Sequence, residues 1–169
     1  MIQHVRDYVV ANMNNAVAVY REFGINPVIT LSHGAKESGW GTSSLAKNYY
    51  NFFGMMAAGP FSKYWSGKKS TNGTWKAYKT AKDSFMDYGR LISTSYPDVY
   101  KFKNDPDKYA WAISQSRYMV DSDNRPKYHS DFLWINKEVS KTIAAEKLSW
   151  SGSGILSLLL IGFIITKIF

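Results

Sequence analysis

Helix-start signals recur along this chain and constrain its fold more than any other feature. Proline stands in the first turn of a candidate helix at three places, namely Asn26-Pro27, Asp105-Pro106 and Pro126. Proline suits that turn because its missing N–H has no intrahelical partner there, and a preceding Asn or Asp can cap the helix. Thr80 followed by Asp83 forms the pattern of a capping box. The chain is therefore expected to fold mainly from α-helices.

The stretches around these signals carry helical periodicity. Apolar residues recur at helical spacing from about Ile2 to Glu22, which predicts a first long helix. A second helix is expected to run from Pro27 until Gly39 ends it, and a short one to cover residues 43–50. Further helices are expected to begin at Thr80, Asp105 and Pro126. Three aromatic residues on the periodic positions of the last two are assigned to the core: Trp111, Phe132 and Trp134.

The segment from Asn51 to Thr80 departs from this pattern. Glycines and a proline interrupt it, and aromatic-rich stretches flank a polar turn, which predicts a β-hairpin. The predicted fold class is therefore mainly α (α+β), a helical domain with a small β-hairpin lobe. A length of 169 residues suffices for one such domain.

The C-terminal segment has a different character. We divide the chain into a folded domain (residues 1–148), a flexible Ser/Gly linker (149–154) and an apolar tail (155–169) whose only charge is Lys167. As a helix the tail would be about 22 Å long, shorter than the hydrocarbon core of a bilayer, about 30 Å. It is expected to be a short membrane anchor, an inserting segment or a plug docked into a partner, and the alternative is a last helix packed on the domain. The N-terminus, MIQHVRDYVV, lacks the pattern of a signal peptide.

Composition narrows the chemistry. The chain has no cysteine, which excludes disulfides, thiolate catalysis and cysteine-ligated metals. Its three histidines are dispersed, so neither a metal nor another cofactor is expected. The net charge of +8 suits a polyanion such as a bacterial wall, an anionic lipid surface or a nucleic acid. Because no nucleic-acid motif occurs, nucleic acid is not an expected partner.

The stretch AKESGWG, residues 35–41, carries the most chemical information. Glu37 lies at the end of a predicted helix, where the helix dipole disfavours an ionised carboxylate. Aromatic neighbours such as Trp40 would also favour the protonated form. A carboxyl group that stays protonated near neutral pH can act as the general acid of a glycosidase. A solvated charge at a helix end explains Glu37 equally well, and His33, one turn earlier, is interpreted as a packed helix residue.

The sequence that follows extends this stretch. It reads AKESGWGTSSLA over residues 35–46 and NFFG over residues 51–54. Two weaker motifs come later: YKTAKDSFMDYGRLI from Tyr78, and YMVD at 118–121 followed by Pro126 and Tyr128. Their order and spacing, over roughly residues 26–139, resemble the glucosaminidase domain of bacterial cell-wall hydrolases, glycoside hydrolase family 73.

The resemblance implies a lysozyme-like helical fold with a cleft beside the small lobe. It implies hydrolysis of the β-1,4 bond between N-acetylglucosamine and N-acetylmuramic acid, with peptidoglycan glycan strands as the partner. Glu37 takes the position of the family's general acid, and Tyr118 matches a tyrosine expected near the scissile sugar. Aromatic and polar residues near the motifs are candidates for sugar contact: Trp40, Asn51, Phe53, Trp65, Trp75, Tyr78 and Tyr128.

One departure from the family pattern leaves the mechanism open. Many members carry a second acidic residue in the lobe, whereas no Asp or Glu occurs here between Glu37 and Asp83. The substrate's own N-acetyl group could attack with help from Tyr118, a distant carboxylate such as Asp121 could activate water, or one carboxylate could suffice, as in lytic transglycosylases. A transglycosylase is therefore the alternative enzyme. The non-enzymatic alternative is a wall-binding component of a phage-tail or injection-type assembly, and the expected location is the cell envelope or a device that delivers the protein to it.

Overall fold

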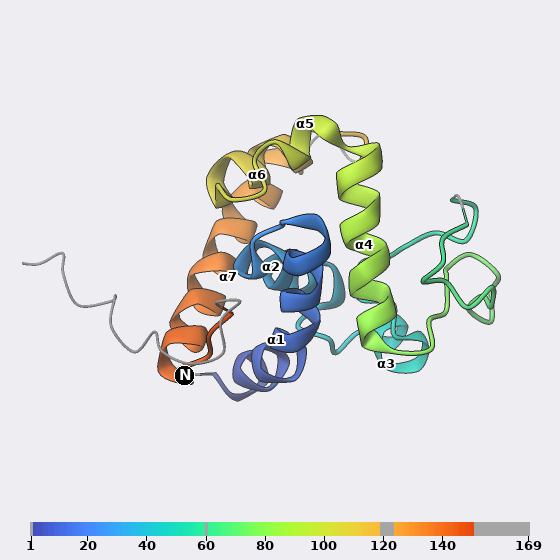
Figure 1. Cartoon of the computed structure of the whole chain (residues 1–169), viewed down its shortest axis with the longest axis horizontal. Coiled ribbons are helices and arrows are strands. Elements are labelled where there is room, and N and C mark those ends of the chain that lie inside the picture. The colour runs from blue at the N-terminus through green and yellow to red at the C-terminus, as the bar shows by residue number, and fades with distance from the viewer. Residues whose placement is uncertain (1, 60, 119–123, 151–169) are drawn as a thin grey trace, which may run out of the picture.

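The helices of this chain begin and end where the sequence signals lie. The computed structural model describes residues 2–59, 61–118 and 124–150 (Figure 1). The helices are α1 (Gln3–Phe23), α2 (Pro27–Ser38), α3 (Ser44–Tyr49), α4 (Ala81–Ser95), α5 (Pro97–Tyr100), α6 (Pro106–Gln115) and α7 (Arg125–Ala145). Asn26 caps α2 by accepting a hydrogen bond from the Val28 N–H at 2.9 Å, and Gly39 ends it at φ 56°. The capping box of Thr80 and Asp83 is also formed, so these predictions are confirmed.

α2 lies at the centre of the helical arrangement and packs against α1 and α7, while α4 packs on α1 and α6 on α7 (Figure 1). Most residues of α2 are buried, and Gly34 is the position at which neighbouring side chains approach this helix most closely. A Cβ atom there would lie 2.5 Å from the Tyr8 hydroxyl oxygen and 3.1 Å from the Phe53 ring. At the C-terminal end of the helix, Lys36 and Glu37 are partly exposed. The fold thus fixes the backbone of α2 and brings its last turn to the surface.

Residues 51–80, which we call the lobe segment, connect α3 to α4 and project from the helices (Figure 1). The predicted β-hairpin occurs only as two isolated antiparallel bridges, Met56 to Trp75 and Lys69 to Lys76, and no strand forms in the described part of the segment. Side chains form hydrogen bonds with several backbone groups of the segment instead. The Asn51 amide donates to the Met55 and Lys76 carbonyls at 3.0 and 2.9 Å. These side-chain bonds hold the segment together beside the few backbone bonds of the two bridges.

A buried ionic cluster attaches the lobe segment to α4. The Lys76 ammonium lies 2.9 Å from the Asp87 carboxylate, and both side chains are almost fully buried. The Tyr78 hydroxyl and the Arg90 guanidinium each donate to the same carboxylate at 2.8 Å. Burial alone would raise the pKa of Asp87, but the hydrogen bonds outweigh it and the pKa lies below its ordinary value. The carboxylate therefore stays ionised in the folded protein.

The core follows the expected helical faces with two exceptions. Phe132 is fully buried, as predicted, but Trp111 and Trp134 are 54% and 52% exposed, so their assignment to the core is wrong. The buried face of α7 runs through Phe132, Ile135 and Val139, spaced at intervals of three and four. Trp134 precedes a core position by one residue, a rotation of about 100° around the helix. It therefore points toward solvent.

The described chain ends at Trp150, which packs with Leu148 against the core. None of the helices in residues 2–59, 61–118 and 124–150 has the length and hydropathy needed to cross a membrane. The predicted tail, residues 155–169, lies outside the described residues, as does most of the predicted linker.

Candidate active site

Glu37 occupies the last turn of α2, where the chain leaves the core through a strained turn. Gly39, Trp40 and Gly41 all have positive φ angles, 56°, 59° and 74°. Such a conformation is costly for a bulky residue and persists only where the surroundings enforce it. The Ser38 hydroxyl accepts a hydrogen bond from the Gly41 N–H at 2.8 Å and so closes the turn. The turn directs the chain from the helix into α3 and leaves Glu37 at the surface.

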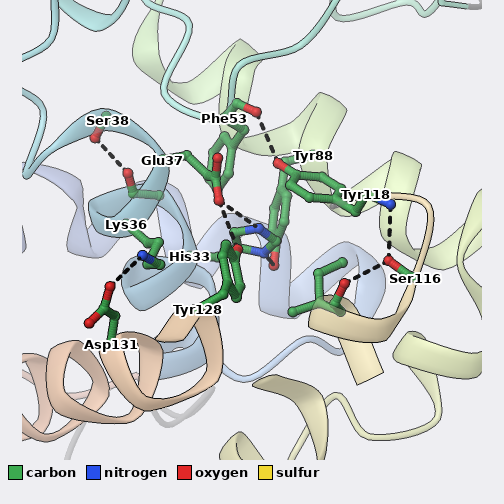
Figure 2. Close-up of polar contacts among 12 residues, drawn as sticks. His33, Lys36, Glu37, Ser38, Phe53, Tyr88, Ser116, Tyr118, Tyr128 and Asp131 are labelled. Atoms are coloured by element: carbon green, nitrogen blue, oxygen red, sulfur yellow. Dashed lines mark hydrogen bonds and ion pairs between the residues drawn. The ribbon is translucent and has the colours of Figure 1, made fainter. Parts of the chain in front are cut away.

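The Glu37 carboxyl is held through one of its two oxygens. The Tyr128 hydroxyl donates to Oε1 at 2.7 Å, and the same oxygen faces the His33 ring at 3.7 Å (Figure 2). The side chain is 23% exposed. Burial raises the pKa of Glu37, and the Tyr128 hydrogen bond and the nearby Lys36 only partly oppose it. A raised pKa is the shift expected of a carboxyl group that acts as a general acid.

Lys36 precedes Glu37 on α2 and opposes the rise of its pKa, but its ammonium is directed elsewhere. Its ammonium lies 3.1 Å from the Asp131 carboxylate and 4.8 Å from the centre of the Tyr128 ring (Figure 2). An ammonium directed at Glu37 would stabilise the ionised form. The pairing with Asp131 on α7 thus limits how far Lys36 can lower the pKa of Glu37.

Below Glu37 lies a buried polar cluster that the sequence pattern does not reveal. His33 is fully buried, and its Nδ1 lies 3.2 Å from the Tyr88 hydroxyl and 3.0 Å from the Tyr109 hydroxyl. These two hydroxyls lie 2.7 Å apart. Burial lowers the pKa of His33 to about 3, with a smaller contribution from Lys36. The ring is thus neutral, and the expected packing role accounts for only part of its contacts.

Tyr118 packs against the His33 ring. Its ring centre is 4.9 Å from that of His33, and its hydroxyl donates to the Phe53 carbonyl at 3.0 Å (Figure 2). Burial raises the pKa of Tyr118 well above the ordinary value, so it remains a neutral phenol. Asp121, the other predicted catalytic residue, lies outside the described residues.

The structure divides the predicted sugar-contacting residues into two groups. Asn51, Phe53 and Tyr78 are buried and directed into the protein. Asn51 holds the lobe backbone, Phe53 stacks on Tyr88 with ring centres 4.1 Å apart, and Tyr78 binds Asp87. Because these contacts lie inside the protein, the three residues are better suited to positioning the site than to touching a ligand.

The other predicted contacts lie nearer the surface. Trp40 is half-buried, and its ring meets that of Trp134 at 6.4 Å, edge to face. Trp65 is also half-buried and donates from its indole nitrogen to the Lys68 carbonyl at 2.7 Å. Trp75 lines a shallow pocket of about 330 Å³ between α3 and the lobe segment. Tyr128 binds Glu37 directly, so of the predicted set it is the residue that the structure brings to the carboxyl.

Comparisons with known proteins agree with this arrangement. The glucosaminidase family, described as mannosyl-glycoprotein endo-beta-N-acetylglucosaminidase, matches residues 13–141. A curated relative from Streptococcus pneumoniae, described as an endo-beta-N-acetylglucosaminidase, is 34% identical over 93 residues, which cover 48% of this chain but 14% of that protein.

Two solved structures share the fold. A peptidoglycan hydrolase from Sphingomonas sp. A1 superposes with a TM-score of 0.64 at 23% identity, covering 89% of this chain and 99% of that one. The glycoside hydrolase domain of Salmonella typhimurium FlgJ superposes with a TM-score of 0.57 at 24% identity, covering 87% and 98%. The family match spans α2 to α6, the ESGWG turn and Tyr128, and this chain belongs to the glucosaminidase family.

Proposed function

We propose that this chain hydrolyses the β-1,4 bond between N-acetylglucosamine and N-acetylmuramic acid in peptidoglycan, with Glu37 as the general acid. The observation that carries the proposal is the state of Glu37. Its side chain is 23% exposed, its pKa is raised, and both the Tyr128 hydroxyl and the His33 ring face Oε1. Oε2 is therefore the oxygen suited to hold the proton and pass it to the glycosidic oxygen of a bound glycan.

The fate of the anomeric carbon depends on a second group. The next two carboxylates in the sequence are occupied by structural contacts, since Asp83 forms the helix cap and Asp87 the buried ionic cluster. This supports attack by the substrate's own N-acetyl group, with the Tyr118 phenol orienting it. Asp121 as a base for water remains the alternative. A single-carboxylate transglycosylase is the other candidate, favoured by the same structural roles of Asp83 and Asp87.

The roles of Tyr118 and Asp121 can be separated by two substitutions. If the acetamido group is the nucleophile, Tyr118→Phe should lower kcat more than Asp121→Asn, because the lost hydroxyl would orient or polarise that group. If Asp121 activates water, the order reverses. Initial rates of wall digestion at saturating substrate provide the measurement, with circular dichroism as the control for folding. Equal and small effects would mean that neither residue acts at the scissile sugar.

We place the site of action at the cell envelope, where the glycan strands lie. The net charge of +8 supports attraction to wall carboxylates and phosphates. Digestion of purified sacculi by the purified chain tests the activity itself, since soluble fragments should appear and the turbidity should fall. Intact sacculi after prolonged incubation with a folded protein would contradict the proposal.

The apolar tail, residues 155–169, is proposed to hold the protein at a membrane or in a larger assembly. Removing residues 151–169 should leave wall digestion and the melting temperature unchanged, because the proposed acid and its described neighbours all precede residue 151. The same truncation should abolish sedimentation with lipid vesicles, or incorporation into the assembly. A truncated chain that no longer folds would instead make the tail part of the core.

A further inference from the structure

The buried triangle of His33, Tyr88 and Tyr109 determines where the histidine proton lies. The three polar atoms, His33 Nδ1 and the two hydroxyl oxygens, are all within 3.2 Å of one another, and both tyrosines are fully buried. If Nδ1 accepts, one tyrosine donates to the other and the second donates to Nδ1, so both hydroxyl protons are used. If Nδ1 carries a proton, one hydroxyl proton has no acceptor within the triangle. Because a buried donor without a partner is costly, the triangle favours a bare Nδ1.

A neutral ring with a bare Nδ1 carries its proton on Nε2. This nitrogen is buried, and within the described part of the chain it makes no hydrogen bond. It lies 3.7 Å from Oε1 of Glu37, slightly beyond hydrogen-bond distance. A buried N–H directed at a carboxyl oxygen, but not yet bonded to it, is a donor placed for the ionised form of that carboxyl.

We propose that His33 is a positioning residue whose Nε2–H binds Oε1 of Glu37 once the carboxyl has given up its proton. Together with Tyr128, it would occupy Oε1 with two donors and leave Oε2 to exchange the proton with the substrate. Tyr88 and Tyr109 act indirectly, because their hydroxyls fix the tautomer of His33. This inference rests on the proposed role of Glu37 as the acid.

Other groups also face this carboxyl and must stay constant in any test. Lys36 lies next to Glu37 on α2, Tyr128 binds the carboxyl from α7, and the rings of Tyr118 and Tyr88 pack against the His33 ring. Asp131 on α7 holds Lys36. His33 can be tested without changing these groups, because different substitutions can place an amide at the position of one or the other of its two ring nitrogens.

Two substitutions perform this separation. In His33→Gln the amide can place an N–H near the position of Nε2, whereas in His33→Asn the shorter side chain reaches only the position of Nδ1. His33→Asn should move the alkaline limb of the pH–rate profile upward by roughly one pH unit, because an ionised Glu37 loses a donor and its pKa rises. His33→Gln should leave that limb near its wild-type position. Equal limbs in both variants, or a downward shift in His33→Asn, would overturn the proposal.

The tautomer of His33 can be determined by NMR, without an activity measurement. In protein labelled with ¹⁵N-histidine, the His33 ring should show the Nε2–H pattern near neutral pH, assigned by its loss in His33→Gln. A proton on Nδ1 would overturn the proposal, and this result holds even where His33→Asn fails to fold. A wild-type chain that leaves sacculi intact would contradict the proposed function instead, whatever the tautomer.

Discussion

Replacing Glu37 with glutamine should lower the rate of wall digestion by about 10²–10⁴-fold, the usual contribution of a positioned general acid. Glutamine keeps the shape of the side chain and can accept the Tyr128 hydrogen bond, but it has no proton to give. Melting temperature and circular dichroism should stay close to those of the wild type. The measurement is the initial rate of release of soluble fragments from sacculi.

A matched control is available on α7. The Glu138 carboxylate pairs with Lys141 at 2.6 Å, ten residues beyond Tyr128 on the same helix, so Glu138→Gln makes the same chemical change away from the site. It should leave the rate unchanged. The wild-type rate should fall as the pH rises through the raised pKa of Glu37, because the acid must be protonated. A folded Glu37→Gln protein that digests walls at a near-normal rate would refute the assignment.

Replacing Asp87 with asparagine should destabilise the folded protein by about 3–5 kcal/mol, the usual cost of breaking a buried ion pair from one side. The change leaves the Lys76 ammonium buried without the carboxylate that it contacts at 2.9 Å. The melting temperature should fall on the order of 10 °C for a domain of this size. The control is Asp98→Asn, whose exposed pair with Lys101 should contribute less than about 1 kcal/mol.

The pH dependence of stability provides a second readout of the same cluster. The folded pKa of Asp87 is lowered, so its contribution is complete above the unfolded value and is lost as the pH falls through the folded value. The wild type should therefore lose stability below about pH 4 more steeply than Asp87→Asn does. Urea unfolding at several pH values measures this. Parallel curves for the two proteins would show that the carboxylate contributes no net stability.

Local sequence signals predicted the helical part of the fold because the physics of a helix end is itself local. The cap at Asn26, the capping box at Thr80 and the glycine at 39 act within one turn, so a short stretch of sequence reveals them. The side of a helix that faces the core depends on its neighbours. Trp134 was wrongly assigned to the core for this reason, since a shift of one residue along a helix separates an exposed position from a buried one.

The site was predictable only in part for a related reason. The ESGWG turn is contiguous, and Glu37 could be found in it. The polar neighbours of His33 lie 55 and 76 residues away, and no spacing rule joins them. The hairpin predicted for the lobe segment is present only as two isolated bridges, and side-chain hydrogen bonds such as those of Asn51, which no local pattern reveals, hold the rest.

The chemistry of the newly formed chain ends tests the central claim most directly. Sacculi digested to completion can be reduced with borohydride and their fragments examined by mass spectrometry. A glucosaminidase should leave N-acetylglucosamine at every new reducing end, seen as its alcohol after reduction. New ends that carry 1,6-anhydro-N-acetylmuramic acid would show a transglycosylase, and reducing N-acetylmuramic acid would show cleavage of the other glycosidic bond. Either result would contradict the assignment.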